Sequence, residues 1–213
     1  MKFKYGKNLT LKDKRTVFID STVILGDDVT IYENNRIEGD TIIRSGAVIM
    51  PGCFIRNCEI GQNSVINSSQ LEDSTVGNNC NIGPFARLRP NSVLKDNVKI
   101  GNFVEVKNAT IGNGSKISHL AYVGDAIIGA DCNVGCGAIF VNYNGRAKHK
   151  TTVGDNCFIG SNCNVIAPVK IDSKAYICAG TTVTEDIKSD DFVIGRVRQQ
   201  IKENRAHEYL KEN

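Results

Sequence analysis

The 213-residue sequence has no tryptophan, and aromatic side chains make up only 7% of it. No apolar stretch approaches the length that a membrane-spanning helix needs. The N-terminal residues Met1 to Lys4 lack the apolar core of a secretory signal peptide, which favours a cytoplasmic protein. Charge is nearly balanced, with 26 basic and 23 acidic residues and a formal net charge of +3. This mild excess is compatible with a small anionic ligand and gives no case for nucleic-acid binding.

The sequence also lacks the spacing expected of metal or disulfide sites, because its eight cysteines contain no C-x-x-C pair. Five cysteines fall four positions after a regularly spaced aliphatic residue, where other repeats carry Ala, Ser, Thr or Val: Cys53, Cys80, Cys132, Cys157 and Cys163. We interpret these five as small buried thiols. No cluster of metal ligands is visible, so no metal is expected.

What the sequence does contain is a six-residue recurrence of aliphatic residues. The recurrence forms three runs: Leu25, Ile31, Ile37, Ile43, Ile49 and Ile55; Val76, Ile82, Leu88, Leu94, Ile100 and Val106; and Val153, Ile159, Val165, Ile171, Ile177 and Val183. Six is neither a helix period nor a simple strand period, and it is typical of a hexapeptide-repeat solenoid. In such an all-β solenoid, three short strands make one triangular coil and the aliphatic residue points inward. The absence of tryptophan and the abundance of Ile and Val fit this narrow core.

The recurrence predicts a domain organisation. We expect an N-terminal extension over 1–16, a β-helix over 17–184 and a tail over 185–213. The helix would have about nine coils and a length of roughly 40 Å at ordinary strand spacing. Residues 199–211 carry a thin apolar stripe that is compatible with a short helix, which would cap the open end of the solenoid.

One large interruption separates Phe140 from Val153, where 13 residue steps replace six. The excursion over 141–152 is strongly basic and contains Tyr143. Insertions in a solenoid loop out on one face, which is often the binding face. A phosphate-binding loop and a plain solvated loop explain this composition equally well.

Two smaller anomalies lie before this excursion. Arg89 and Lys107 each follow an aliphatic residue directly and are 18 positions apart, so they should stack on one face, one coil apart. Stacked cations repel each other unless an anion lies between them, which favours a phosphate site over two solvated side chains. His119 occupies an outward position near a corner, within one to two coils of the basic loop. A lone histidine is more often structural than catalytic, so its role depends on its neighbours.

Several segments together resemble one family, the bifunctional N-acetylglucosamine-1-phosphate uridyltransferase/glucosamine-1-phosphate acetyltransferases, in their acetyltransferase half. The segments that carry the resemblance are 83–90, 101–105, 114–116, His119-Leu120, 124–126, Asn142-Tyr143, 167–169, 179–184 and Arg196-Val197. The resemblance implies a left-handed parallel β-helix, although crossovers between parallel strands are ordinarily right-handed. It also implies a homotrimer with active sites between subunits and acetyl transfer from acetyl-CoA to the amine of glucosamine-1-phosphate.

The resemblance further implies roles for individual residues. His119 matches the general base, Glu105 an acidic residue that orients it, and Asn142 and Tyr143 a pair near the reacting groups. Five residues match the family's sugar-phosphate-binding residues: Arg89, Lys107, Tyr122, Asn133 and Lys148. Residues that match acetyl-CoA contacts are Ser161, Ala179 and Arg196.

The sequence departs from this family in places. Asn144 replaces an Asp, Cys136 stands where Ala is usual, and Arg198 stands where Pro is frequent. The family's nucleotidyltransferase domain has no counterpart, because the solenoid is expected to begin near residue 17. We therefore expect no uridyltransferase activity, and either a stand-alone acetyltransferase, one that works beside a separate uridyltransferase, or a fragment.

Three alternatives to acetyl transfer onto glucosamine-1-phosphate are considered. The acceptor could be another amino sugar phosphate or a sugar nucleotide, since such enzymes change acceptors through their loops. The chain could instead be a non-catalytic trimeric scaffold, although a scaffold needs none of His119, Asn142, Tyr143 and Arg196. A carbonic anhydrase of the β-helical class needs three suitably spaced zinc-binding histidines, and the three in this chain are too scattered for that.

Overall fold

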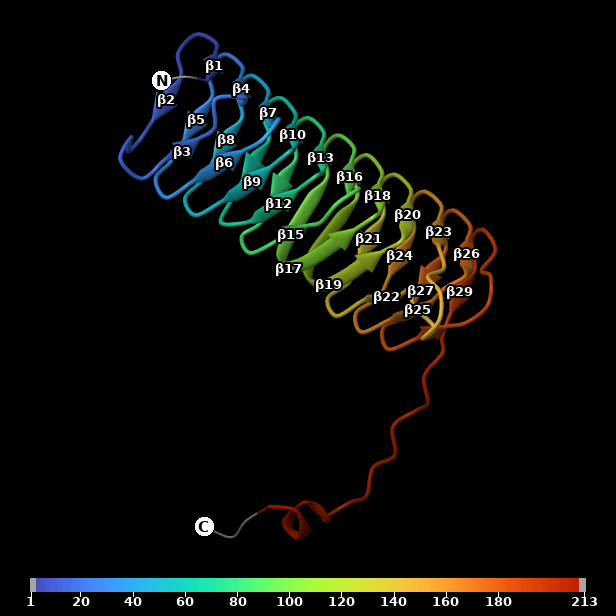
Figure 1. The fold of residues 1–213 in the computed structure, drawn as a ribbon. Helices are drawn as coiled ribbons and strands as arrows, with labels where there is room; N and C mark the ends of the chain where they lie inside the picture. Colours follow the sequence, from blue (N-terminus) through green and yellow to red (C-terminus); the bar gives the residue numbers. More distant parts are fainter. Residues whose placement is uncertain (1–2, 211–213) are drawn as a thin grey trace.

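Three short strands build each coil of a parallel β-helix in the computed structural model, which describes residues 3–210 (Figure 1). One face of the prism is a ten-stranded parallel sheet of β1 (Lys4–Tyr5), β4 (Ile24–Leu25), β7 (Ile42–Ile43), β10 (Glu59–Ile60), β13 (Thr75–Val76), β16 (Val93–Leu94), β18 (Thr110–Ile111), β20 (Ala126–Ile128), β23 (Thr151–Val153) and β26 (Val169–Ile171). We call this the first face.

The other two faces belong to one 19-stranded sheet, because two long strands run continuously from one face to the other. These long strands are β17 (Lys99–Lys107) and β19 (Lys116–Gly124). The second face consists of their first halves together with β2 (Thr10–Leu11), β5 (Thr30–Ile31), β8 (Val48–Ile49), β11 (Val65–Ile66), β14 (Asn81–Ile82), β21 (Asn133–Val134), β24 (Phe158–Ile159), β27 (Tyr176–Ile177) and β29 (Phe192–Val193). The third face consists of their second halves together with β3 (Phe18–Ile19), β6 (Arg36–Glu38), β9 (Phe54–Arg56), β12 (Gln70–Glu72), β15 (Arg87–Leu88), β22 (Ile139–Val141), β25 (Asn164–Ile166) and β28 (Thr182–Val183).

The helix has about eleven coils rather than about nine, since the bridge from Ile171 to Ile187 adds one turn beyond the ten strands of the first face. Two of the additional strands lie within the segment expected as an N-terminal extension. There β1 pairs with β4 and β2 pairs with β5, so residues 4–11 already take part in the solenoid. Their aliphatic spacing is irregular, which is why the six-residue period alone places the first coil too late.

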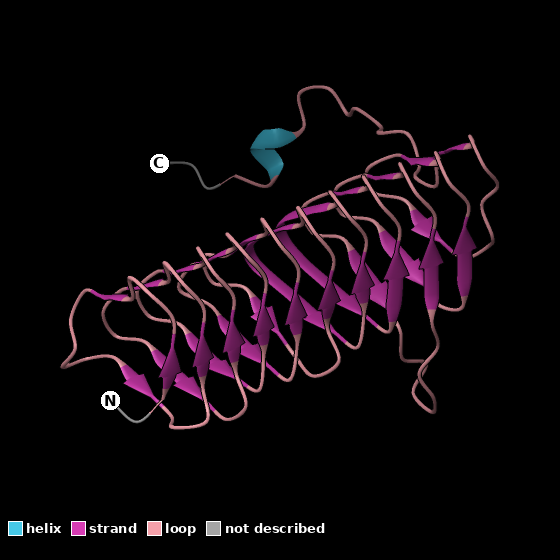
Figure 2. Cartoon of the chain, turned by 90° about the horizontal axis from the view of Figure 1, so that it is seen from above, coloured by secondary structure: helices cyan, strands magenta, loops and turns pink. Residues whose placement is uncertain are grey.

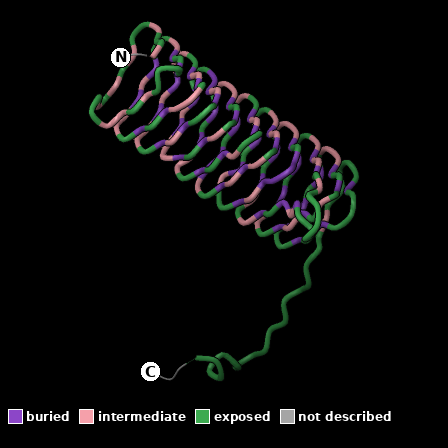
Figure 3. The backbone as a smooth tube through the Cα atoms, in the orientation of Figure 1, coloured by how far each residue is buried: buried purple, intermediate pink, exposed green. Residues whose placement is uncertain are grey.

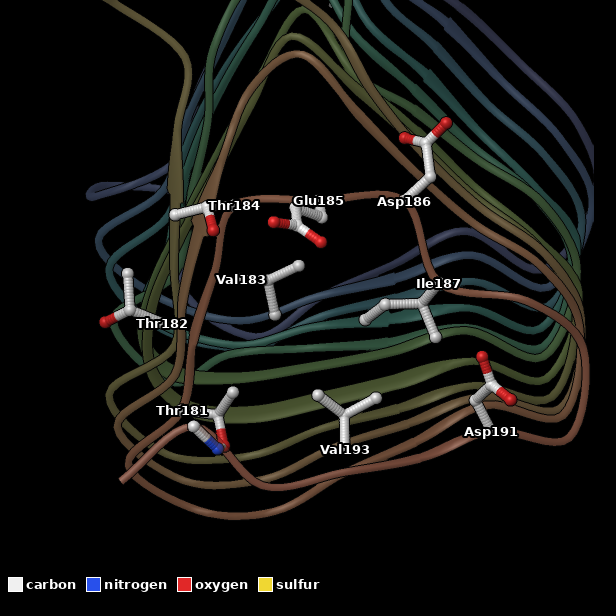
Figure 4. A pocket seen from close by; sticks show the side chains of 10 residues that line it. Thr181, Thr182, Val183, Thr184, Glu185, Asp186, Ile187, Asp191 and Val193 are labelled. Atoms are coloured by element: carbon white, nitrogen blue, oxygen red, sulfur yellow. The ribbon is translucent and has the colours of Figure 1, made fainter. Parts of the chain in front are cut away.

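The coil is left-handed, as the family resemblance implies. Figure 4 looks along the helix axis from the C-terminal end, with the last coil nearest to the viewer. The chain passes from Thr181 to Thr184, then to Asp186 and on to Asp191. This path is clockwise as it approaches the viewer, which defines a left-handed turn.

The inward-pointing aliphatic residues form one continuous core along the axis. Buried residues recur from coil to coil along the solenoid (Figure 3). Ile37, Ile43, Ile49 and Ile55 are fully buried, whereas the strand residue before each of them is exposed or half-buried. This alternation is the period of two expected for a strand with one buried side.

Each coil turns at corners where one residue adopts a positive φ. At one corner the residues Asn8, Asp28, Asn63, Asn79, Asn97, Asp131 and Asn156 have φ between 53° and 60°. Asn and Asp tolerate this left-handed conformation better than other residues with a side chain, which explains their recurrence. A bulky apolar residue is unfavourable in this conformation, so its presence at a corner position calls for an explanation other than the turn itself.

The prediction of small buried thiols is confirmed for the five named cysteines. Cys53, Cys80, Cys132, Cys157 and Cys163 have at most 2% of their surface exposed, and all eight cysteines are free. Burial raises the pKa of the Cys53 thiol to about 11, which keeps it protonated and unreactive at neutral pH. Cys136 differs because it lies exposed at a corner.

The two irregular segments are the basic excursion and the tail. The excursion leaves the row of coils after β22 and returns at β23 (Figure 2). The tail expected over 185–213 begins later than predicted, because Ile187 and β29 still pair with the preceding coil. Beyond β29 the chain runs away from the last coil (Figure 1), and within residues 194–210 its only helix or strand is one 3-10 turn, η1 (Ala206–Glu208). The expected helix over 199–211 is therefore wrong in extent within the described residues, and Lys211 lies outside them. Within residues 194–210 no helix covers the end of the solenoid, where a hollow of about 250 Å³ is lined by Val183, Ile187 and Val193 (Figure 4).

Candidate active site

Three cations gather where the third face ends. Leu88 pairs with Val106 in the parallel register, and the backbone N–H of Arg89 donates to the Val106 carbonyl at 2.9 Å. Arg89 and Lys107 therefore lie one coil apart on one face, as their spacing predicts. The ammonium group of Lys148 adjoins that of Lys107, and this contact, followed by the charge of Arg89, lowers the pKa of Lys107. We call Arg89, Lys107 and Lys148 the basic cluster.

Arg89 is held in place by Glu105. Its Nη1 donates to the Glu105 carboxylate at 2.7 Å, and this bond raises the pKa of Arg89. Glu105 lies opposite Tyr122 in the register, whereas His119 lies opposite Asn102. Among the described residues the Glu105 carboxylate accepts a hydrogen bond from Arg89, and no hydrogen bond joins it to His119. The expected orienting role of Glu105 stays a prediction.

Asp125 lies next to the basic cluster, and its backbone N–H donates to the Lys107 carbonyl at 3.1 Å. Its carboxylate accepts hydrogen bonds from the side-chain amides of Asn108 and Asn142. A Cβ on the neighbouring Gly124 would lie 2.4 Å from the Tyr122 hydroxyl and 2.8 Å from Nδ2 of Asn142. Glycine is therefore needed for these two polar groups to lie so close together. Asp125 is a site residue that sequence reasoning missed, although the segment 124–126 was part of the family resemblance.

The basic excursion is an ordered loop. Tyr143 and Lys148 form an antiparallel bridge across it, and the Tyr143 hydroxyl donates to the Gly145 carbonyl at 2.7 Å. The side-chain amide of Asn144 lies 2.9 Å from Nε2 of His149. These bonds fix the base of the loop and so place Lys148 beside Lys107. Asn144, the departure from the family pattern, has a structural partner in this loop.

A column of residues runs along the corner between the second and third faces. The register pairs Ile117 with Val134, Val134 with Ile159 and Ile159 with Ile177. Two positions after these partners stand the members of what we call the corner column: His119, Cys136, Ser161 and Ala179. Arg196 follows at its end, since its Cδ lies 3.5 Å from where a Cβ of Gly180 would be. The structure thus aligns His119 with all three residues expected to contact acetyl-CoA.

The expected site residues fall into two groups within one chain. One group comprises the basic cluster with Glu105, Tyr122, Asn142 and Tyr143, on the third face and the loop beyond it. The other comprises the corner column, Arg196 and also Asn133, which lies on the second face between Lys116 and Phe158. No hydrogen bond or ion pair among residues 3–210 joins the two groups. Asn133 is therefore not brought to the basic cluster of its own chain.

Between the two groups lies an exposed apolar ridge. Phe85, Phe103 and Leu120 occupy corner positions of three successive coils with φ of 58°, 57° and 38°, where Asn or Gly is usual. Their side chains are 58–62% exposed. A hollow of about 420 Å³ beside the ridge is lined by Phe103, Leu120 and residues of the third face such as Tyr122 and Ile139. Bulky residues cost free energy in this backbone conformation, so a purely structural corner would not select them.

Within residues 3–210, no three or more His, Cys, Asp or Glu side chains are grouped so that they could hold a metal ion. Nor does the described part of the chain contain a helix that is long and apolar enough to cross a membrane.

Comparison with known proteins identifies relatives of this arrangement. The chain is 49% identical over 195 residues to the bifunctional protein GlmU of Clostridioides difficile, and 47% identical over 196 residues to that of a Geobacillus species. The chain is therefore homologous to one part of GlmU. The matches cover 92% of the chain but only 42% and 43% of these relatives, so the chain spans about two fifths of the length of a GlmU protein. The family resemblance predicted from the sequence is thereby confirmed.

Two family models match shorter parts of this GlmU homologue. Residues 70–143 match the C-terminal domain of GMPPB, and residues 150–185 match the hexapeptide repeat of succinyl-transferase. Among solved structures, LpxA from Bacteroides fragilis, a UDP-N-acetylglucosamine acyltransferase, has a TM-score of 0.44 and 19% identity. That match covers 87% of this chain and 64% of the LpxA chain.

Proposed function

We propose that the protein is an acetyltransferase that moves acetyl from acetyl-CoA to the amine of glucosamine-1-phosphate, giving N-acetylglucosamine-1-phosphate for UDP-N-acetylglucosamine synthesis. The observation that carries this proposal is the basic cluster. Lys107 and Lys148 adjoin each other, and neither has an ion pair with a carboxylate among residues 3–210. A phosphate between them would remove the repulsion that lowers the pKa of Lys107.

The chemistry assigns a role to each group of residues. The amine must lose a proton to attack the thioester, and the imidazole of His119 is the side chain that would accept it. Backbone N–H groups near the corner would stabilise the oxyanion that forms. The basic cluster and Tyr122 would hold the sugar phosphate. Ser161, Ala179 and Arg196 would hold acetyl-CoA along the corner column.

The separation of the two groups supports an active site between subunits of a homotrimer. The ridge of Phe85, Phe103 and Leu120 lies between the groups and offers an apolar surface for a second copy of the chain. Burial against a partner would repay the backbone cost of bulky residues at these corners. In this assembly His119 and Asn133 of one chain would face the basic cluster of its neighbour.

The principal test is release of free CoA from acetyl-CoA in the presence of a panel of amino sugars. We expect release with glucosamine-1-phosphate and loss of release in His119→Ala, while the tail variant His207→Ala keeps it. Release only with another amino sugar phosphate or sugar nucleotide would replace the acceptor in this proposal. Absence of release with every amine would leave the non-catalytic scaffold as the function.

Two further parts of the proposal concern the protein's surroundings. Because acetyl-CoA and sugar phosphates are substrates held in the cytoplasm, we place the enzyme there.

A separate uridyltransferase would consume its product. Co-purification with a uridyltransferase, or its absence, tests that partner.

A further inference from the structure

The last three coils carry a ladder of exposed aromatic rings on the second face. Phe158 of β24, Tyr176 of β27 and Phe192 of β29 are paired in register. Their rings are stacked with centroids 4.6 Å and 5.2 Å apart and interplanar angles of 12° and 17°. The two preceding coils present Lys116 and Asn133 at the same position. The ladder is therefore a local feature of the C-terminal end.

The ladder ends in a free aromatic face. Tyr176 lies between two rings, whereas Phe192 has Tyr176 on one side and no ring on the other within residues 3–210. Phe192 is 65% exposed although it lies in a strand of the last coil. Stacking on Tyr176 fixes the orientation of the Phe192 ring. A fixed and exposed ring is a platform on which a planar base can stack.

This platform lies at the far end of the corner column. From His119 the column passes Cys136, Ser161 and Ala179 and reaches Gly195 by the pairing of Ile177 with Val193. These four coil steps correspond to about 19 Å at strand spacing. Coenzyme A carries its thiol and its adenine at opposite ends of a long arm. A thioester beside His119 therefore directs the adenine toward the last coil.

Cations accompany the platform. Arg196 and Arg198 are exposed, and neither forms an ion pair with a carboxylate among the described residues. Arg196 follows Phe192 by four residues, at most about 13 Å of extended chain. An aromatic face and a guanidinium group at this spacing suit a nucleotide, whose base can stack while its phosphate pairs with arginine.

We propose that Phe192 stacks on the adenine ring of acetyl-CoA and that Tyr176 and Phe158 position it for this task. The inference rests on the proposed function, since it assumes acetyl-CoA along the corner column. It adds an adenine-binding residue that distinguishes acetyl-CoA from acyl donors without a base.

The test compares two donors that share the thioester and pantetheine arm. Acetyl-CoA contains adenosine, and S-acetyl-phosphopantetheine does not. We expect Phe192→Ala to raise the KM for acetyl-CoA by roughly tenfold without changing the KM for S-acetyl-phosphopantetheine. Phe192→Trp should retain the wild-type preference. Phe18→Ala is the matched control, because Phe18 is 64% exposed at the opposite end of the solenoid.

Three outcomes separate this inference from the proposed function. An unchanged KM for acetyl-CoA in Phe192→Ala, or an equal rise for both donors, overturns the inference and leaves the acetyl transfer intact. Calorimetric titration with CoA alone shows the adenine contact without any acceptor. Weaker CoA binding in Phe192→Ala, in a protein that does not acetylate glucosamine-1-phosphate, supports the inference and refutes the acceptor. Failure of the wild-type protein to bind CoA overturns both.

Discussion

Lys148 of the basic loop lies beside Lys107 at the end of a third-face strand. Their contact is the first cause of the lowered pKa of Lys107, ahead of the charge of Arg89. The antiparallel bridge to Tyr143 holds Lys148 in this position. An ordered pair of like charges costs free energy in the unliganded protein, and a bound phosphate would relieve that cost.

Removal of one of these charges should weaken phosphate binding selectively. We expect Lys107→Ala to raise the KM for glucosamine-1-phosphate by roughly ten- to hundredfold, because a hydrogen bond between charged groups is lost. The KM for acetyl-CoA should change little. Lys99→Ala is the control, since Lys99 lies on the same strand but on the second face. Equal effects of the two variants would mean that only general charge matters.

Mixed oligomers should reveal whether one site needs two chains. His119→Ala and Lys107→Ala remove residues from the two separate groups. His119→Ala alone should be inactive, and Lys107→Ala alone should have little activity at substrate concentrations well below its raised KM. Unfolding and refolding the two together should restore a part of the wild-type activity, because some interfaces then combine an intact His119 with an intact Lys107. Mixtures that stay inactive while forming mixed oligomers would place the whole site in one chain.

Glu105 should act on the sugar phosphate through Arg89. Loss of its charge in Glu105→Gln frees the Arg89 guanidinium from its 2.7 Å partner, so we expect a several-fold higher KM for glucosamine-1-phosphate. The pH dependence of kcat should keep its midpoint, because no hydrogen bond joins Glu105 to His119 among the described residues. A shifted midpoint would show that Glu105 orients the histidine after all, from a neighbouring subunit.

The apolar ridge should control assembly more than folding. In Phe103→Asn the new residue tolerates the φ of 57°, which gains about 1 kcal/mol, while the exposed stack with Phe85 is lost at a comparable cost. The melting temperature of the separated chain should therefore change little, while sedimentation shows dissociation of the oligomer. Phe18→Asn, an exposed aromatic far from the ridge, should leave the assembly intact. An undisturbed oligomer in Phe103→Asn would remove the ridge from the interface.

The buried thiols should make the protein sensitive to alkali. The pKa of Cys53 is raised from 9.0 to about 11 by burial, so its stabilising effect is complete below pH 9 and is lost as pH rises through 11. The difference of two units corresponds to roughly 2 to 3 kcal/mol of unfolding free energy. Urea unfolding at pH 8 and pH 11 should show a smaller loss in Cys53→Ala than in the wild type. Cys136→Ala should behave as the wild type, because Cys136 is exposed.

Much of the fold follows from the chain's own six-residue period. Inward Ile and Val, a small residue such as Cys four positions later and a turn-forming Asn or Gly are properties of each repeat, so local sequence predicts the coil. The stacking of Arg89 on Lys107 also follows, because both lie in a run without insertions. The first coil was missed since residues 4–19 depart from the period.

The arrangement of the candidate site could be decided only by the tertiary structure. The members of the corner column are 17, 25 and 18 residues apart, and the middle interval contains the basic excursion. Sequence spacing cannot align them until the strand register does. The Arg89 partner of Glu105, the role of Asp125 and the contact between Lys107 and Lys148 depend on side chains meeting across coils. By itself the sequence determined a repeating coil and its anomalies, whereas long-range pairing decided which anomalies face one another.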